Sequence, residues 1–326
     1  MMTMSRYWRR LLAAGTVLAI LAYGCGEQDT VDHGGELVSR DGRIAFTRAI
    51  SFGPSEFDSE VYTVGVDGSG ERRLTDTPGL DAFPAWSPDG TRITFASDRD
   101  GNWEIYVMDP DGARQQRLTN TLKDEASPAW SPDGEKIAYV TDPASEYPSI
   151  HVMNSDGSKQ RRLTNGNWPS WSPDGKRIVY TTYHDVGVPF RLAVMNADGS
   201  DQQGLTDSPI RRLTRTAYGE EPAWSPDGTR IAFAGQTFRG DGEIYVIKAD
   251  GSGRTRLTDI AGYAHWPPTW SPDGDRIAFT SEGTEGNPEI YVMNSDGTGL
   301  TRLTNDPAED MFPAWQPSGS SPTHAR

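Results

Sequence analysis

Six positions along the chain lie three residues before the proline of a Pro-x-Trp motif, and most of them carry side chains that could bind a ligand. The residues at these positions are Asp81, Glu125, Gly166, Gly219, His265 and Asp310. Carboxylates and imidazoles can hydrogen-bond a peptide or a sugar. Two carboxylates at a suitable separation could also hydrolyse a glycosidic bond. If the fold repeats with the motif, these side chains meet at one site.

Two tryptophans outside the Pro-x-Trp motifs lie close to these positions in the sequence. Trp168 and Trp266 could offer ring faces to a peptide or a sugar beside the carboxylates. The ligand-binding residues that we predict are therefore Asp81, Glu125, Trp168, His265, Trp266 and Asp310. The alternative interpretation is a solvated acidic rim with two locally packed tryptophans.

The sequence offers little for catalysis or metal binding. It contains no Gly-x-Ser-x-Gly or His-Glu-x-x-His motif, and Cys25 is its one cysteine. Residues 98–102 resemble a calcium loop, but glycine occupies the fourth place instead of the sixth, which favours a surface turn. We therefore predict no catalytic residue, no metal and no cofactor.

A sequence repeat must position the candidate residues. Trp-Ser-Pro-Asp-Gly occurs five times and is followed by one degenerate copy, and the copies begin at Trp86, Trp130, Trp171, Trp224, Trp270 and Trp315. The glycines that close the copies lie 44, 41, 53, 46 and 45 residues apart, which is typical of one four-stranded propeller blade per repeat. Ser-Pro-Asp-Gly predicts a tight turn between the first two strands of a blade. Each repeated tryptophan can bury about 150–250 Å², which predicts a core role.

The two ends of the repeat array predict how the ring closes. Residues 43–46 begin a blade that lacks a tryptophan-bearing strand, and residues 312–315 form a spare strand of that kind. Pairing the two ends would leave no free sheet edge. We therefore predict an all-β fold: a six-bladed β-propeller over residues 41–319, with four antiparallel strands per blade and the C-terminal strand joining blade 1. We expect residues 320–326 to be a disordered tail.

The N-terminal residues predict export. Three arginines precede an apolar run over residues 11–22, which identifies residues 1–24 as a signal peptide. Residues 21–25, Leu-Ala-Tyr-Gly-Cys, resemble a bacterial lipobox, which predicts a lipid anchor on Cys25 and a flexible tether over residues 25–40. Simple secretion after Gly24 is the alternative. We expect the protein in the periplasm or on the cell surface, with membrane contact only through the anchor.

Charge narrows the range of partners. The full chain carries a net charge of −15, and removing the three arginines of the signal peptide leaves about −18. A strongly acidic protein is repelled by phosphate backbones. We therefore expect no nucleic acid partner.

The repeat resembles that of a known protein family. The pattern Pro-x-Trp-Ser-Pro-Asp-Gly-x-x-Ile-Ala-Phe, followed by Glu-Ile-Tyr-Val-Met-Asn-x-Asp-Gly and Arg-Leu-Thr-Asn, is similar to the WD-like repeat of the TolB family over residues 41–319. The resemblance implies a six-bladed propeller of the bacterial envelope that binds proteins, and we expect a monomeric scaffold for an envelope protein or peptide. Three alternatives stay open: a cell-wall glycan as ligand, a carbohydrate-active lyase or hydrolase, and a relative of the propellers of prolyl-oligopeptidase-like peptidases without the hydrolase domain.

The loops predict which face of the propeller binds its partner. The turns after the first and third strands of each blade emerge on one face and are nearly constant, whereas the loops on the other face differ in every blade. Two insertions, residues 47–60 and 202–221, fall on or near the variable face. We therefore expect binding on the variable-loop face, at the mouth of the central channel.

Overall fold

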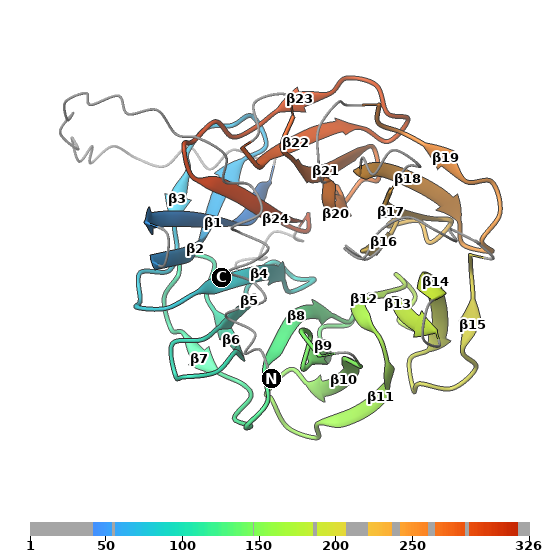
Figure 1. Ribbon diagram of the computed structural model, residues 1–326, viewed down its shortest axis with the longest axis horizontal. Coiled ribbons are helices and arrows are strands. Elements are labelled where there is room, and N and C mark those ends of the chain that lie inside the picture. Colours follow the sequence, from blue (N-terminus) through green and yellow to red (C-terminus); the bar gives the residue numbers. More distant parts are fainter. Residues whose placement is uncertain are drawn as a thin grey trace, which may run out of the picture.

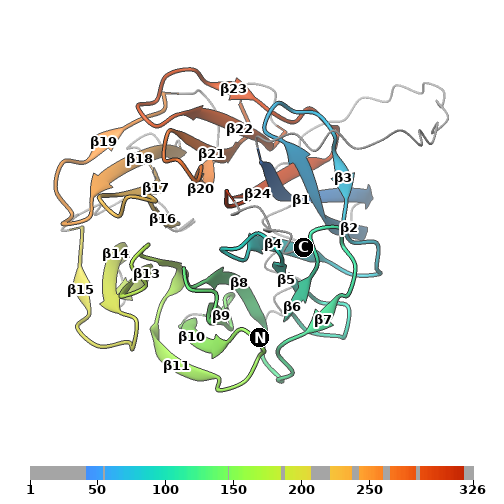
Figure 2. The same cartoon turned by 180° about the vertical axis from the view of Figure 1, so that it is seen from behind.

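The computed structural model describes residues 42–53, 56–145, 147–184, 188–206, 221–236, 242–259, 265–283 and 287–318. Within these residues 24 strands form six four-stranded sheets. The sheets are arranged as blades around a common centre, seen from one side in Figure 1 and from behind in Figure 2. The predicted six-bladed β-propeller is confirmed. The signal peptide, the tether with Cys25 and the tail over residues 320–326 lie outside the described residues.

The first three blades contain the strands up to β11 together with β24. Blade 1 consists of β24 (Glu309–Trp315), β1 (Arg43–Gly53), β2 (Glu56–Gly65) and β3 (Arg72–Arg73). Blade 2 consists of β4 (Asp81–Trp86), β5 (Ile93–Ser97), β6 (Glu104–Met108) and β7 (Gln116–Arg117). Blade 3 consists of β8 (Glu125–Trp130), β9 (Lys136–Thr141), β10 (Ser149–Asn154) and β11 (Arg161–Asn165).

The last three blades continue round the ring in chain order. Blade 4 consists of β12 (Asn167–Trp171), β13 (Arg177–His184), β14 (Val188–Asn196) and β15 (Gln203–Gly204). Blade 5 consists of β16 (Pro222–Trp224), β17 (Arg230–Gln236), β18 (Gly242–Lys248) and β19 (Thr255–Arg256). Blade 6 consists of β20 (His265–Trp270), β21 (Arg276–Ser281), β22 (Glu289–Asn294) and β23 (Thr301–Arg302). The first strand of each blade, β24, β4, β8, β12, β16 or β20, lies nearest the centre in Figure 1.

The ring closes as the sequence predicts. The C-terminal strand β24 pairs antiparallel with β1, with Trp315 opposite Ile44 and Ala314 opposite Ala45. The insertion over residues 47–60 lengthens the hairpin of blade 1, where β1 has 11 residues and β2 has 10. Much of the second insertion, residues 207–220, lies outside the described residues. In the described part of the chain, no helix is long and apolar enough to cross a membrane.

The Ser-Pro-Asp-Gly turn holds the first two strands of a blade together. In blade 2 the Ser87 hydroxyl donates to Asp89 Oδ1 at 2.6 Å, and the Gly90 N–H donates to the Ser87 carbonyl at 2.8 Å. Gly90 has a φ of 68°, a conformation that glycine adopts without the steric cost that a Cβ atom brings. The same serine-to-aspartate bond recurs in four other turns, of which the one between Ser271 and Asp273 is an example.

The repeated tryptophans join each blade to the one before it. All six are buried, with 6–8% of each residue exposed. The Trp130 indole N–H donates to Thr94 Oγ1 of the preceding blade at 3.0 Å, and the Arg92 guanidinium of that blade lies 4.9 Å from the Trp130 ring centroid. In three other blades the indole N–H donates instead to a backbone carbonyl of the preceding blade, that of the residue directly before its tryptophan. The tryptophans thus build the core that positions the central strands.

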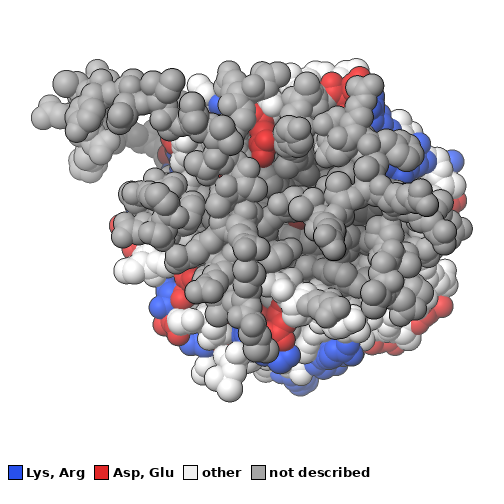
Figure 3. All heavy atoms as spheres, viewed as in Figure 1, with Lys and Arg blue, Asp and Glu red and all other residues white. Residues whose placement is uncertain are grey.

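On the outside of the ring, charged side chains of both signs lie along its circumference in Figure 3.

Candidate functional site

The innermost strands share an irregularity beside their prolines. In β4 the register with β5 shifts by one residue between Ala82 and Ala85, so that two residues of β4 oppose one residue of β5. This is a β-bulge, which bends a strand and re-aims a side chain. Equivalent shifts occur in β8, β12, β20 and β24.

The residue directly before the proline adopts an unusual backbone conformation in four of these strands. Its φ is positive at Phe83, Ser127, Trp168 and Phe312, with values from 52° to 58°. A left-handed conformation costs a residue with a Cβ atom roughly 1–2 kcal/mol. The surrounding sheet must therefore hold these residues in place, and such strain is often found at functional sites.

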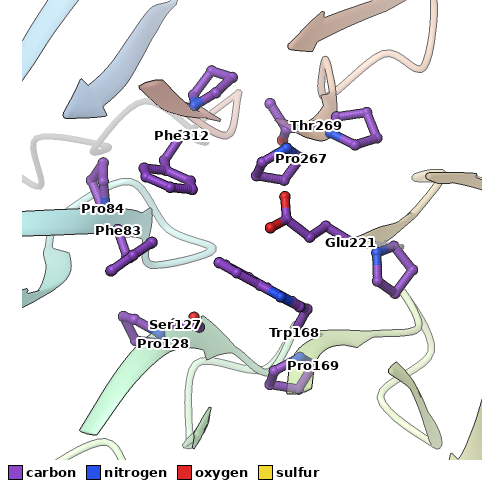
Figure 4. Close-up of a pocket in the computed structure, with 13 residues that line it drawn as sticks. Phe83, Pro84, Ser127, Pro128, Trp168, Pro169, Glu221, Pro267, Thr269 and Phe312 are labelled. Carbon is purple, nitrogen blue, oxygen red and sulfur yellow. The ribbon is translucent and has the colours of Figure 1, made fainter. Parts of the chain in front are cut away.

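The residues directly before the motif prolines meet in a pocket at the centre of the propeller. The pocket has a volume of about 190 Å³ and is lined by 13 residues, which Figure 4 shows as sticks. All six blades contribute the residue directly before the proline of the Pro-x-Trp motif: Phe83, Ser127, Trp168, Glu221, Pro267 and Phe312. The six motif prolines and Thr269 complete the lining. The prolines that frame the pocket are thus the same in every blade, whereas the residue before the proline varies among five types.

Three aromatic rings from three blades form one side of the pocket. The ring centroids of Phe83 and Phe312 lie 4.4 Å apart, and those of Phe83 and Trp168 lie 5.7 Å apart. Trp168 stacks on Phe312 with an interplanar angle of 18° and a centroid separation of 6.1 Å. Trp168 is half-buried and both phenylalanines are buried. Trp168 is therefore the aromatic residue of this group that is most accessible to a ligand.

Glu221 is the one ionisable residue among the 13 that line the pocket. Its carboxylate points into the pocket between Trp168 and Pro267 in Figure 4. The residue is 5% exposed, and its Oε2 atom accepts no hydrogen bond from a described residue. Burial raises the pKa of Glu221 well above its usual range. A carboxyl group in this environment keeps its proton unless a cation arrives.

Three of the predicted site residues lie between blades and not at the surface of the pocket. Asp81 and Asp310 are 0% exposed and Glu125 is 1% exposed. The β-bulge begins at the residue directly before the proline, and this residue lines the pocket. The residue two places earlier stays in the regular ladder, where Asp81 pairs with Ser97, and its carboxylate is buried. The structure therefore does not present these carboxylates at the channel mouth, where the sequence predicted them.

Arginines neutralise two of these buried carboxylates. Arg99 lies 2.8 Å from Asp81 Oδ2, and Arg48 donates to both oxygens of Asp310 at 2.7 Å. Arg48 also lies 2.6 Å from Glu71. Each arginine compensates the charge of a buried carboxylate, so we interpret these contacts as structural ion pairs.

Each of the three carboxylates also lies near a glutamate on the third strand of the preceding blade. These glutamates are Glu60, Glu104 and Glu289, and each forms an ion pair with the arginine of an Arg-Leu-Thr segment. In blade 6, for example, Glu289 accepts from Arg302 and from the Thr304 hydroxyl, each at 2.6 Å. The sequence reasoning missed this network. The recurrence of Glu-Ile-Tyr-Val followed by Arg-Leu-Thr was the signal that could have revealed it.

Glu125 differs from its counterparts because it has no ion pair with a described basic residue. Its Oε1 accepts from the Thr121 hydroxyl at 2.7 Å, and the Thr121 backbone N–H donates to Glu104 Oε1 at 2.9 Å. Burial, and then hydrogen bonding and repulsion from Glu104, raise the pKa of Glu125 well above its usual range. Glu125 and Glu104 therefore form a buried acid pair that retains a proton on Glu125.

The other predicted site residues have different outcomes. Trp168 lines the pocket, as described above. The backbone of His265 and Trp266 lies at the start of β20, opposite Ser281 and Thr280, but the side chains of both lie outside the described part of the structure. Among the described residues, no group of three or more His, Cys, Asp or Glu side chains could hold a metal ion.

Comparison with known proteins places the chain in a family. Residues 47–212 and 214–321 match the family model of the TolB beta propeller domain. The chain belongs to this family. A TolB homologue of Chlorobium luteolum is 42% identical to this TolB-type propeller over 62 residues, and dipeptidyl-peptidase 5 of Porphyromonas gingivalis is 40% identical over 68 residues. These alignments cover 19% and 20% of the chain but only 13% and 10% of the two relatives.

A solved structure extends the likeness to the whole fold. The structure of TolB from Acinetobacter baumannii matches with a TM-score of 0.70 over 85% of this chain and 67% of that chain. The sequence identity is 21%, so this comparison supports the shared fold alone. Because each curated relative aligns over a short part of its length, what this TolB-type propeller binds must be inferred from its own residues.

Proposed function

We propose that this TolB-type propeller is an exported, lipid-anchored scaffold of the bacterial envelope that binds a protein or peptide at its central pocket, without catalysing a reaction. The observation that carries the proposal is a contrast within the pocket: its six motif prolines are constant, whereas the residue before each proline varies. All six blades present the residue directly before the motif proline, and these residues include Phe83, Trp168, Glu221 and Phe312. Rigid frames with variable residues at one place are typical of binding sites.

The chemistry of the pocket suits part of a polypeptide. Binding pockets combine apolar and aromatic walls with a few polar groups that fix orientation. Here the walls are three aromatic rings and seven prolines, and the polar groups are Ser127, Thr269 and Glu221. A volume of about 190 Å³ is roughly six times the 30 Å³ that a water molecule occupies in the liquid, so a single side chain fits. The partner would therefore insert one side chain while its remaining surface rests on the surrounding loops.

Export and anchoring are supported by the N-terminal sequence. Residues 1–24 have the basic start and apolar run of a signal peptide, and Cys25 ends a segment similar to a lipobox. A single acyl chain anchors weakly, and a second chain makes attachment stable. A tethered propeller would stay at the membrane and leave its pocket free for a partner.

Affinity capture from an envelope extract tests the proposed site. We expect the Phe83→Ala/Trp168→Ala variant to recover at least ten-fold less partner than the wild-type protein, because the two rings form much of the pocket wall. The matched control is Leu300→Ala, which removes an exposed apolar side chain from the turn between β22 and β23, on the constant face. A second variant, Thr269→Phe, fills the pocket without removing a ring, and it guards against misfolding of the first. Equal recovery by all the variants would overturn the proposed site.

A further inference from the structure

Glu221 has no partner for its charge within the described structure. It forms no hydrogen bond or ion pair with another described residue, and burial is the sole cause of its raised pKa. The other 12 residues that line the pocket are uncharged, and none of them titrates. A buried polar group without a partner costs free energy, and a buried carboxylate costs more. The folded protein bears this cost at the centre of its candidate binding site.

The groups around Glu221 favour a positive charge. The faces of aromatic rings attract cations within about 6 Å of their centroids, and tryptophan is the strongest of them. Trp168 lies beside the Glu221 carboxylate in Figure 4, and Phe83 and Phe312 lie across the pocket. An anion would be repelled by an ionised Glu221, and an aliphatic side chain would leave its carboxyl group without a partner. A cation would satisfy the carboxylate and the rings together.

The size and composition of the pocket further restrict the cation. The pocket holds about 190 Å³, which admits the end of one side chain and excludes a folded domain. Proline-rich and aromatic walls suit the apolar stem of a long basic side chain, whose charged end lies beyond that stem. We propose that the pocket binds the side chain of a lysine or arginine from the partner polypeptide, with Glu221 as its counter-ion. This inference rests on the proposed function, because it names the group that the partner inserts.

The inference includes a proton transfer that can be measured. In the unoccupied pocket Glu221 holds its proton, and the incoming cation stabilises the ionised carboxylate. Binding therefore releases up to one proton from Glu221 to solvent. The pocket and the basic side chain together lose one positive charge, which the released proton carries into the solvent. No other residue that lines the pocket can supply this proton. Affinity for the basic side chain should rise with pH until Glu221 is ionised in the unoccupied protein.

The test uses small probes and the full chain. N-acetyl-lysine methylamide and N-acetyl-arginine methylamide carry the two basic side chains, and N-acetyl-citrulline methylamide is a neutral analogue of the arginine probe. We expect calorimetric titration to show binding of both basic probes to the wild-type protein, and at least ten-fold weaker binding of the citrulline probe. Glu221→Gln should weaken the basic probes at least ten-fold. The control Glu135→Gln makes the same change at an exposed turn and should leave binding unchanged.

Two further measurements make the outcome decisive. Titration in two buffers of different ionisation enthalpy should show proton release on binding to the wild-type protein and none with Glu221→Gln. Thermal unfolding of Glu221→Gln should confirm that the variant is folded, since glutamine has nearly the same shape as glutamic acid. Citrulline binding as tight as arginine binding, unchanged affinity in Glu221→Gln, or no saturable binding of either basic probe would each overturn the inference.

Partner capture separates this inference from the proposed function. If Glu221→Gln recovers the partner fully while Phe83→Ala/Trp168→Ala does not, the pocket is the binding site but Glu221 is not the counter-ion of a basic side chain. If both variants recover it fully, the proposed site itself fails.

Discussion

Replacing Glu125 with glutamine should stabilise this propeller, although Glu125 is buried and lies between two blades. The side chain is 1% exposed and accepts from the Thr121 hydroxyl at 2.7 Å. Among the described residues, no donor forms a hydrogen bond with Glu125 Oε2 or Glu104 Oε2. A proton on Glu125 is therefore needed to join the two acids. Glutamine would keep the acceptor for Thr121 and could donate its amide to Glu104 without titrating.

The size of the expected stabilisation follows from the pH range in which Glu125 holds a proton in the folded state but not in the unfolded state. The pKa of Glu125 is raised above the 4.5 expected in the unfolded chain, so the folded state holds a proton that the unfolded state loses. Between pH 4.5 and the raised pKa, stability falls as pH rises, by about 1.36 kcal/mol per pH unit. At pH 7, which is 2.5 units above the unfolded-state value, the cost approaches about 3 kcal/mol. Glu125→Gln removes this cost.

Urea unfolding followed by tryptophan fluorescence would measure the effect. We expect Glu125→Gln to exceed the wild-type free energy of unfolding by about 3 kcal/mol at pH 7, and the difference to approach zero near pH 4.5. The exposed variant Glu135→Gln controls for the change in net charge. A Glu125→Gln protein less stable than wild type at pH 7, or a difference that does not change with pH, would refute the reasoning.

Two other variants test the ion pairs and the anchor. Asp310→Asn should lower the free energy of unfolding by about 3 kcal/mol in urea unfolding, because it leaves the buried Arg48 guanidinium with only Glu71 and Asp306 as partners. The exposed pair Arg256–Asp259 provides the control Asp259→Asn, and a loss below about 1 kcal/mol for Asp310→Asn would contradict the account. Cys25→Ala should move the protein from the membrane fraction to the soluble fraction, and unchanged fractionation would instead indicate simple secretion.

The fold was predictable because each repeat encodes its own geometry. Ser-Pro-Asp-Gly specifies a turn, and the tryptophan before it supplies the surface that joins neighbouring blades. The spare strand at residues 312–315 showed how the ring would close, and β24 pairs with β1 in that way. These features depend on local sequence, which can be read without knowing the structure.

The site was only partly predictable because its geometry depends on an irregularity. Trp168 was identified as a candidate and lines the pocket, whereas Glu221 was missed. A β-bulge beside the motif proline, found in five of the six innermost strands, changes which residue faces the pocket, and regular strand alternation does not predict it. One signal was present in the sequence. The residue directly before the motif proline differs in most blades, as Phe83, Ser127 and Glu221 illustrate, within an otherwise constant Pro-x-Trp frame.

The buried acid network was hidden for a different reason. Acidic residues three places before the proline suggested ligand contacts, but their partners lie far away in the sequence. Asp310, for example, bonds Arg48, which is 262 residues distant. Closure of the ring brings the two together, so the burial of Asp310 could not be read from its neighbours in the chain.

The central claim is that the partner occupies the pocket at the bulged positions, and site-specific cross-linking tests it most directly. Phe312, which lines the pocket, would be replaced by the photo-reactive residue p-benzoyl-phenylalanine, and the control would carry the same residue at Leu300, which is 43% exposed on the constant face. We predict that illumination in an envelope extract cross-links the partner to position 312 and not to position 300. Cross-linking at position 300 without any at position 312 would contradict the claim.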